Sequence, residues 1–223
     1  ARSSSHHPYT DSSGIAARIG TSIRKVSDGE RKFLKRLDLA EESANGARRE
    51  SGVNSDESDD PIHVRHKPPT VLERPRELVL ACPPFRSAVN LSRIVRAAGC
   101  CGIGRIIVEG PIRLDKKIAR DGAEQVELES RRSLDPVLVR MKQEGYRLVG
   151  LEQASRSVST FDYRFERRTC LVIGHERDGI PDERLKLMDD VIEIPVYGMP
   201  FSHNVATATT MALYEYCRQL PLG

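Results

Sequence analysis

Residues Leu171 to Val205 read LVIGHERDGIPDERLKLMDDVIEIPVYGMPFSHNV. Two short apolar runs in this stretch are typical of buried strands, and each leads into a loop of little steric bulk. The first run, 171–173, ends at Gly174. The second run, 191–194, leads through a glycine- and proline-containing loop into a helical pattern over 204–220. Loops of this kind bind ligands through their backbone, so a site is expected where the two strands end.

The rest of the C-terminal part continues this alternation. Further apolar runs predict buried strands at 78–80, 105–108 and 147–150. Helical periodicity predicts helices over 87–98, 134–144, 181–189 and 204–220, with helix ends at Gly99, Gly145 and Pro221. Strands that alternate with helices indicate an α/β fold with a mostly parallel sheet and helices on both faces.

Residues 1–70 differ in composition from the rest. They are rich in Ser, Asp, Glu, Gly and Asn, so we expect a largely disordered polar tail. Within it, Ser27-Asp-Gly-Glu30 has the form of a capping box and precedes apolar residues at helical spacing. We therefore expect a short basic amphipathic helix over 28–42, which either docks by its apolar stripe or binds a polyanion. Residues 76–220 remain for one globular domain.

The net charge and the cysteines indicate how the protein binds a polyanion and in which compartment it is found. The net charge is only +3, so binding of a polyanion depends on local patches. Arg131-Arg132 and Arg164/Arg167/Arg168 are the candidate clusters, with ordinary solvated surface as the alternative. The five cysteines lack CxxC spacing, which favours free thiols in a reducing cytoplasm. We expect no metal, because His63-x-x-His66 lies in a proline-flanked polar segment.

Membrane insertion and secretion are not expected. No apolar run approaches the length of a membrane span, and no signal-peptide pattern opens the chain. The sequence therefore predicts a cytoplasmic protein.

The residues that are candidates for binding or catalysis form three groups along the chain. The first lies on the predicted helix 87–98, and the other two follow the strands of the opening stretch. They are Asn90 and Arg96; Gly174, Glu176 and Gly179; and Ile194, Pro195, Gly198, Ser202, Asn204 and Val205.

In this order and at these separations, the groups resemble the three signature motifs of the SpoU branch of the SPOUT superfamily of RNA methyltransferases. The resemblance covers roughly residues 76–220, and Gly122-Ala123-Glu124 and Leu151-Glu152 resemble intermediate blocks of the family. It implies a C-terminal trefoil knot and a homodimer joined through helices at the knotted end. The implied activity is transfer of a methyl group from S-adenosyl-L-methionine to a ribose 2′-hydroxyl in structured RNA, either tRNA or rRNA.

The resemblance also implies roles for single residues. Arg96 either stabilises the developing alkoxide or acts as the base, and an arginine normally stays protonated, which favours the first role. The implied catalytic set is Arg96, Asn90, Glu176, Ser202 and Asn204. The implied cofactor-binding set is Leu151, Glu152, Gly174, Gly179, Ile194, Gly198, Ser202 and Val205. The implied RNA-binding set is Arg93, Arg96, Arg131 and Arg132.

Other interpretations of the same residues stay open. Asn90 and Ser202 also suit plain helix caps, and the glycines suit turns. A catalytically silent SPOUT-fold scaffold that binds RNA is one alternative to the enzyme. A SPOUT enzyme that methylates a base is another, although Arg96 with the Ser-x-Asn third motif favours ribose. His203 replaces a usually apolar residue of that motif, and residues 1–70 do not resemble the substrate-binding domain of many relatives.

Overall fold

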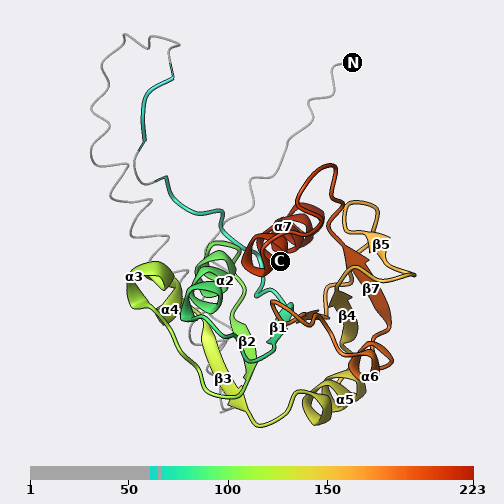
Figure 1. Ribbon diagram of the computed structural model, residues 1–223. Coiled ribbons are helices and arrows are strands. Elements are labelled where there is room, and N and C mark those ends of the chain that lie inside the picture. Colours follow the sequence, from blue (N-terminus) through green and yellow to red (C-terminus); the bar gives the residue numbers. More distant parts are fainter. Residues whose placement is uncertain (1–60, 65–66) are drawn as a thin grey trace, which may run out of the picture.

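The computed structural model describes residues 61–64 and 67–223, so the helix expected over 28–42 lies outside the described residues. Within these residues, seven strands form one sheet in the order β3-β2-β1-β6-β4-β7-β5, and every pairing is parallel (Figure 1). The strands are β1 (Val79–Cys82), β2 (Arg105–Glu109), β3 (Glu127–Arg131), β4 (Arg147–Leu151), β5 (Val158–Ser159), β6 (Thr169–Ile173) and β7 (Asp190–Glu193).

Helices cover both faces of the sheet, as expected (Figure 1). They are α2 (Ala88–Cys100), α3 (Lys116–Ala119), α4 (Gly122–Gln125), α5 (Asp135–Gln143), α6 (Asp182–Leu185) and α7 (Val205–Gln219). Alternate residues of β1 belong to two separate cores because strand side chains alternate between faces. Leu80 packs in the core beneath α2 and α7, whereas Val79 packs in the core beneath α5. No helix in the described part of the chain is long and apolar enough to cross a membrane.

The five predicted strands are all present, and two further strands were missed. β3 reads ELESR and lies at an edge of the sheet, so it lacks the apolar run by which the buried strands were identified. β5 consists of only two residues at the opposite edge. No side chain of β3 or β5 is fully buried, so neither strand needs an apolar run.

Two predicted helix boundaries are wrong. Gly99 does not end a helix but lies inside α2, where a Cβ would sit 3.0 Å from the Cα of Gly122. The glycine therefore permits close approach of α4 to α2. The helix expected over 181–189 spans only 182–185. Gly145 has φ +83 just after α5 and so ends that helix as predicted.

The segment before β1 is tied to the C-terminus of the chain. The Glu73 amide donates to the carbonyl of Leu222 at 3.0 Å. Arg74 Nε donates to the carbonyl of Gly223 at 3.0 Å. Arg76 adds a hydrogen bond of 3.2 Å to the carbonyl of Pro221. These contacts attach residues 73–76 to the segment that follows α7.

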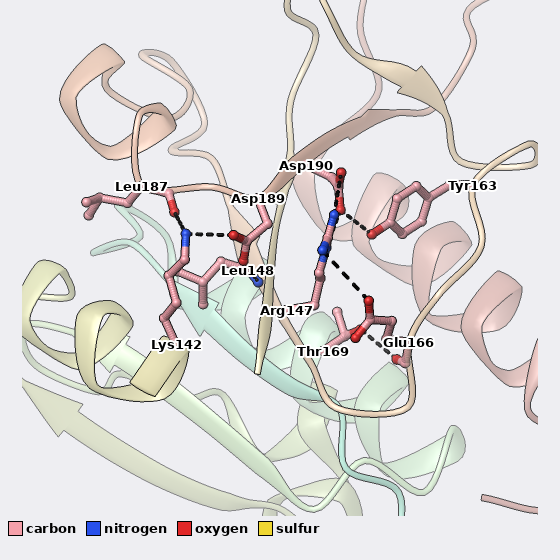
Figure 2. Close-up of polar contacts among 9 residues, drawn as sticks. All are labelled: Lys142, Arg147, Leu148, Tyr163, Glu166, Thr169, Leu187, Asp189 and Asp190. Atoms are coloured by element: carbon pink, nitrogen blue, oxygen red, sulfur yellow. Dashed lines mark hydrogen bonds and ion pairs between the residues drawn. The ribbon is translucent and has the colours of Figure 1, made fainter. Parts of the chain in front are cut away.

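An ion-pair network connects the amino ends of β4 and β7 (Figure 2). Arg147 binds the Asp190 carboxylate through Nε at 2.7 Å and Nη2 at 3.2 Å. The Tyr163 hydroxyl donates to the same carboxylate at 2.7 Å. The hydrogen bond from Arg147 lowers the pKa of Asp190 below its ordinary value. Lys142 Nζ lies 2.6 Å from Asp189 Oδ1. These contacts fix one end of the two strands, and the other end is left for a site.

Candidate functional site

A pocket of about 210 Å³ lies where the carboxyl ends of β4, β6 and β7 meet the start of α7. Ligands bind at this edge in open parallel sheets. All residues of the predicted cofactor-binding set except Gly198 line it, namely Leu151, Glu152, Gly174, Gly179, Ile194, Ser202 and Val205. Gly198 lies in the loop before α7, where a Cβ would have no heavy atom within 4 Å.

Glu152 explains why two of the glycines are required. Its Oε2 accepts a hydrogen bond from the Ile180 amide at 2.9 Å, and its Oε1 accepts one from the Gln153 amide at 3.1 Å. A Cβ on either Gly174 or Gly179 would lie 2.5 Å from Oε2. Gly179 also has φ +66, a conformation that favours glycine. The Glu152 side chain therefore holds the loop after β6 in place.

Asn90, Glu176 and Asn204 come from three distant parts of the chain and form one hydrogen-bonded chain. Asn90 Nδ2 donates to Glu176 Oε1 at 3.1 Å, and Asn204 Nδ2 donates to Asn90 Oδ1 at 3.2 Å. Asn204 Oδ1 in turn accepts from the Ala206 amide at 3.0 Å and so caps α7. Because the Glu176 carboxylate only accepts, the orientation of both amides is fixed.

The residues that cap α2 and α7 decide whether Asn90 and Ser202 are plain helix caps. The N-cap of α2 is Ser87, whose hydroxyl accepts from the Val89 amide at 3.1 Å. Asn90 is therefore not a cap, and its amide is directed to Glu176 and Asn204. Ser202 is not the cap of α7 either, because Asn204 occupies that position. Ser202 and His203 are exposed and line the pocket.

The pocket is also lined by residues outside the predicted cofactor-binding set, and two of them, His175 and Gln153, have side-chain partners that organise the loops. The ring nitrogens of His175 face carboxylates on both sides, with Nδ1 2.9 Å from Asp178 Oδ2 and Nε2 3.4 Å from Glu176 Oε2. Gln153 Nε2 donates to the carbonyl of Phe201 at 3.2 Å and so connects the loop after β4 to the loop before α7. Both residues lie in the loops after β4 and β6, where a site was expected from the strand ends.

Arg96 is not part of the hydrogen-bonded chain. It is exposed on α2, six residues after Asn90, which places it roughly 9 Å further along the helix axis. Arg93 is exposed one turn earlier. Within residues 61–64 and 67–223, neither arginine has a side-chain hydrogen bond or an ion pair, so both guanidinium groups are available to a ligand.

The other predicted arginines divide into engaged and available groups. Arg131 forms an ion pair with Glu129 and donates to the carbonyl of Ser130 at 3.0 Å. Arg167 donates to the carbonyl of Pro75 at 2.6 Å, and the guanidinium of Arg168 lies 4.8 Å from the ring centre of Tyr146. The exposed Arg132 and Arg164 have no such side-chain contact within the described ranges. Part of each predicted cluster thus stabilises the fold.

The described residues contain no group of three or more His, Cys, Asp or Glu side chains arranged to hold a metal ion.

Comparisons with known proteins identify relatives of this chain. The sequence pattern of the SpoU rRNA Methylase family matches residues 77–214. The tRNA (guanosine(18)-2'-O)-methyltransferase of Escherichia coli K12 is 28% identical over 149 residues, which cover 66% of this chain and 65% of that protein. The chain thus spans just under two thirds of this relative's length.

Two solved structures share the fold. The A. aeolicus TrmH/SpoU tRNA modifying enzyme superimposes with a TM-score of 0.64 at 27% identity, over 67% of this chain and 78% of that one. The SpoU methyltransferase AviRb from Streptomyces viridochromogenes, in complex with AdoMet, gives a TM-score of 0.55 at 28% identity over 68% of this chain and 64% of that one. The family pattern covers more than half of the sequence and includes the residues gathered at the pocket, and on this ground the chain belongs to the SpoU rRNA methylase family.

Proposed function

We propose that this protein transfers a methyl group from S-adenosyl-L-methionine to a ribose 2′-hydroxyl of structured RNA. The observation that carries the proposal is the chain of hydrogen bonds from Asn204 through Asn90 to Glu176, next to a pocket at the carboxyl ends of parallel strands. Three polar side chains from separate segments are held here in one orientation. A silent scaffold has no use for such an arrangement.

The walls of the pocket fit the proposed donor. Leu151, Ile173 and Ile194 supply apolar surface for a nucleoside. Gly174 and Gly179 let the backbone approach a ligand closely. AviRb, which shares the fold, was crystallised in complex with AdoMet. When bound, the donor supplies an electrophilic methyl group on a positively charged sulfur.

The residues of this chain then act mainly by positioning and electrostatics. Glu176 fixes Asn90, and Asn90 fixes Asn204 beside the pocket. We assign Ser202, which is exposed at the same pocket, to the reacting centre. Arg96 binds the phosphate next to the target ribose and stabilises the negative charge that develops on the hydroxyl oxygen. As the bond from this oxygen to the methyl group forms, the bond from the methyl group to sulfur breaks, the donor leaves as a neutral thioether, and the hydroxyl proton passes to solvent water. We assign charge stabilisation to Arg96 because a guanidinium stays protonated.

The test compares Arg96 variants in an assay of methyl transfer to RNA. Arg96→Ala should abolish turnover and leave the binding of S-adenosylhomocysteine, measured by calorimetry, nearly unchanged. Arg96→Lys keeps the charge but loses the planar guanidinium, so its activity separates simple charge from a bidentate phosphate contact. Turnover of Arg96→Ala at the wild-type rate would show that the assignment is wrong.

Mapping of 2′-O-methyl groups in total RNA, from cells with and without the gene, identifies the nucleotide and distinguishes tRNA from rRNA. A methyl group found on a base instead of a ribose would favour the base-methylating alternative. A folded protein that binds RNA and gives no detectable heat with S-adenosylhomocysteine would favour the scaffold.

We also infer a trefoil knot in the C-terminal part. β7 lies between β4 and β5, although these two strands are consecutive in sequence. The connection over 152–157 must therefore pass across β7. Electron density for residues 150–205 in a crystal of the protein tests whether the later segment passes through this loop.

A homodimer is the assembly that we propose. The loop between β7 and α7 exposes Tyr197, Met199 and Phe201 to 91%, 75% and 76%. Large apolar side chains that gather in one exposed segment mark an interaction surface.

We place the protein in the cytoplasm, since its five cysteines are all free thiols. Residues 76–220 are proposed as the methyltransferase domain and 1–70 as its tail.

A further inference from the structure

Arg120 has a backbone conformation that a residue with a side chain rarely adopts. Its φ is +50 and its ψ is −141, at the position that follows α3. Within residues 61–64 and 67–223 it is the only residue other than glycine with a positive φ. Glycine adopts this region without steric cost, so an arginine here lowers the stability of the fold. Such a residue is retained where its side chain has a use that glycine cannot supply.

The fold itself does not use this side chain. Arg120 is exposed, and its guanidinium has no hydrogen bond or ion pair with the described residues. Two other arginines, Arg147 and Arg184, show the contrast because each is paired with a carboxylate. Arg147 lies 2.7 Å from Asp190, and Arg184 lies 2.6 Å from Asp135.

Arg120 lies beside the helix that carries Arg96. Two residues after it, the backbone of Gly122 packs so closely on α2 that a Cβ would lie 3.0 Å from the Cα of Arg96 and 2.9 Å from the carbonyl oxygen of Val95. The start of α3 is tied to the same helix, because the Asp115 amide donates to Ser92 Oγ at 2.8 Å. The turn containing Arg120 is thus held against α2 at the level of Arg96.

The surface around this turn is basic. Exposed cationic side chains with no ion pair among the described residues occur on α2, in the loop before α3, on α3 and directly after it. They are Arg93, Arg96, Arg113, Lys116, Lys117 and Arg120. The acidic residues of the same segment are Asp115, Asp121 and Glu124. Asp115 is occupied as the N-cap of α3, where its Oδ1 accepts from the Lys117 amide at 2.8 Å. Cations exceed acids in these segments, and the packing of Gly122 against Arg96 brings the turn with Arg120 next to α2.

We propose that Arg120 is a positioning residue that binds a backbone phosphate of the RNA, next to the phosphate assigned to Arg96. This inference rests on the proposed function. A guanidinium forms two parallel hydrogen bonds to a phosphate, and Lys116 and Lys117 favour the same anion. Phosphate contacts of this kind fix the register of a nucleic acid and carry no base specificity. The arginine therefore orients the RNA strand that presents the target ribose.

The inference is tested with the variant Arg120→Gly, by measuring its melting temperature and its affinity for RNA. The variant should be more stable than the wild type and should bind RNA more weakly. The melting temperature should rise by about 2 °C or more as the strained backbone relaxes. Binding of bulk tRNA and of rRNA by the full chain should weaken by about 5- to 10-fold. The salt dependence of binding should flatten by about one unit of slope. S-adenosylhomocysteine affinity should not change.

Two further variants separate charge from backbone. Arg120→Lys keeps both the charge and the strain, so it should retain the wild-type salt slope and melting temperature. Arg140→Ala is the matched control, because this arginine is 53% exposed on α5, which packs on the opposite face of the sheet. It removes one positive charge without touching the surface around Arg120.

The outcomes are distinguishable. If Arg120→Gly binds RNA as tightly as Arg140→Ala while the wild type methylates RNA, the inference is overturned and the proposed function stands. If the wild type binds neither tRNA nor rRNA, the inference about Arg120 and the proposed function are both overturned. A fall in the melting temperature of Arg120→Gly would show that the arginine is kept for the fold, and this also overturns the inference.

Discussion

Replacement of Gly174 by alanine tests the geometry of the loop after β6. Gly174 does not have a positive φ, so the backbone itself tolerates alanine. The added Cβ would lie 2.5 Å from Glu152 Oε2 and 3.1 Å from the backbone of Gly179. The carboxylate is not free to move away, because Oε2 accepts the Ile180 amide at 2.9 Å.

The structure has two ways to respond, and their costs are similar. If the loop shifts, overpacking costs about 1–3 kcal/mol. If Glu152 moves, the Ile180 amide loses its partner, which also costs about 1–3 kcal/mol. Alanine recovers about 0.4–1 kcal/mol by restricting the unfolded chain. The net loss lies between about 0 and 2.6 kcal/mol, and its midpoint of about 1.3 kcal/mol lowers the melting temperature by about 3–5 °C. Loss of one backbone hydrogen bond to the ligand weakens S-adenosylhomocysteine binding by about 2- to 10-fold.

Gly198→Ala is the matched control, since its Cβ would meet no heavy atom within 4 Å. Thermal denaturation followed by circular dichroism, together with calorimetry, should show wild-type ligand affinity and an unchanged or slightly higher melting temperature. Glu152→Ala should remove the clash, so the double variant Gly174→Ala/Glu152→Ala should be less destabilised than the sum of the single variants. If Gly174→Ala and Gly198→Ala behave alike, the steric reasoning is refuted.

Three further predictions concern the ion-pair network, the tail and the dimer. Asp190→Asn should lower stability by about 1 kcal/mol at neutral pH, because the carboxylate binds Arg147 at 2.7 Å. The pKa of Asp190 is lowered in the folded state, so the difference from the wild type should disappear in melting curves as the pH falls through and below the ordinary range of an aspartate. A chain that begins at Pro69 should keep its melting temperature and ligand binding, and a flatter salt slope of RNA binding would identify the tail as an RNA arm. Tyr197→Ser should shift the protein toward monomer in light scattering, and a wild-type monomer with full activity would refute the dimer.

Short-range patterns in the sequence determined most of the secondary structure. The run at 171–173 is apolar because both faces of β6 are covered, and this burial is visible in the sequence without any tertiary information. The run at 191–194 was recognised from Val191, Ile192 and Ile194, although only Ile192 of β7 is fully buried. Gly174 and Gly179 were expected at a ligand loop, and they line the pocket. The pocket's position at the strand ends follows from the alternation of strands and helices.

The tertiary structure decided which polar groups meet. The distances from Asn204 to Asn90 and from Asn90 to Glu176 depend on how α2 and α7 pack on the sheet, and no local pattern records that packing. The same holds for Gly99, which has the appearance of a helix end but is required by the approach of α4.

The backbone conformation of Arg120 and the partners of the arginine side chains are also visible only in the structure. Arg120 is one of many arginines in the sequence, and only its φ of +50 and its place beside α2 set it apart. Arg167 and Arg132 both belong to predicted basic clusters, yet the first is hydrogen-bonded to the carbonyl of Pro75 and the second is not engaged within the described part of the chain. Periodicity reports which side of a segment is buried, whereas the neighbours of a side chain depend on contacts between segments far apart in the sequence.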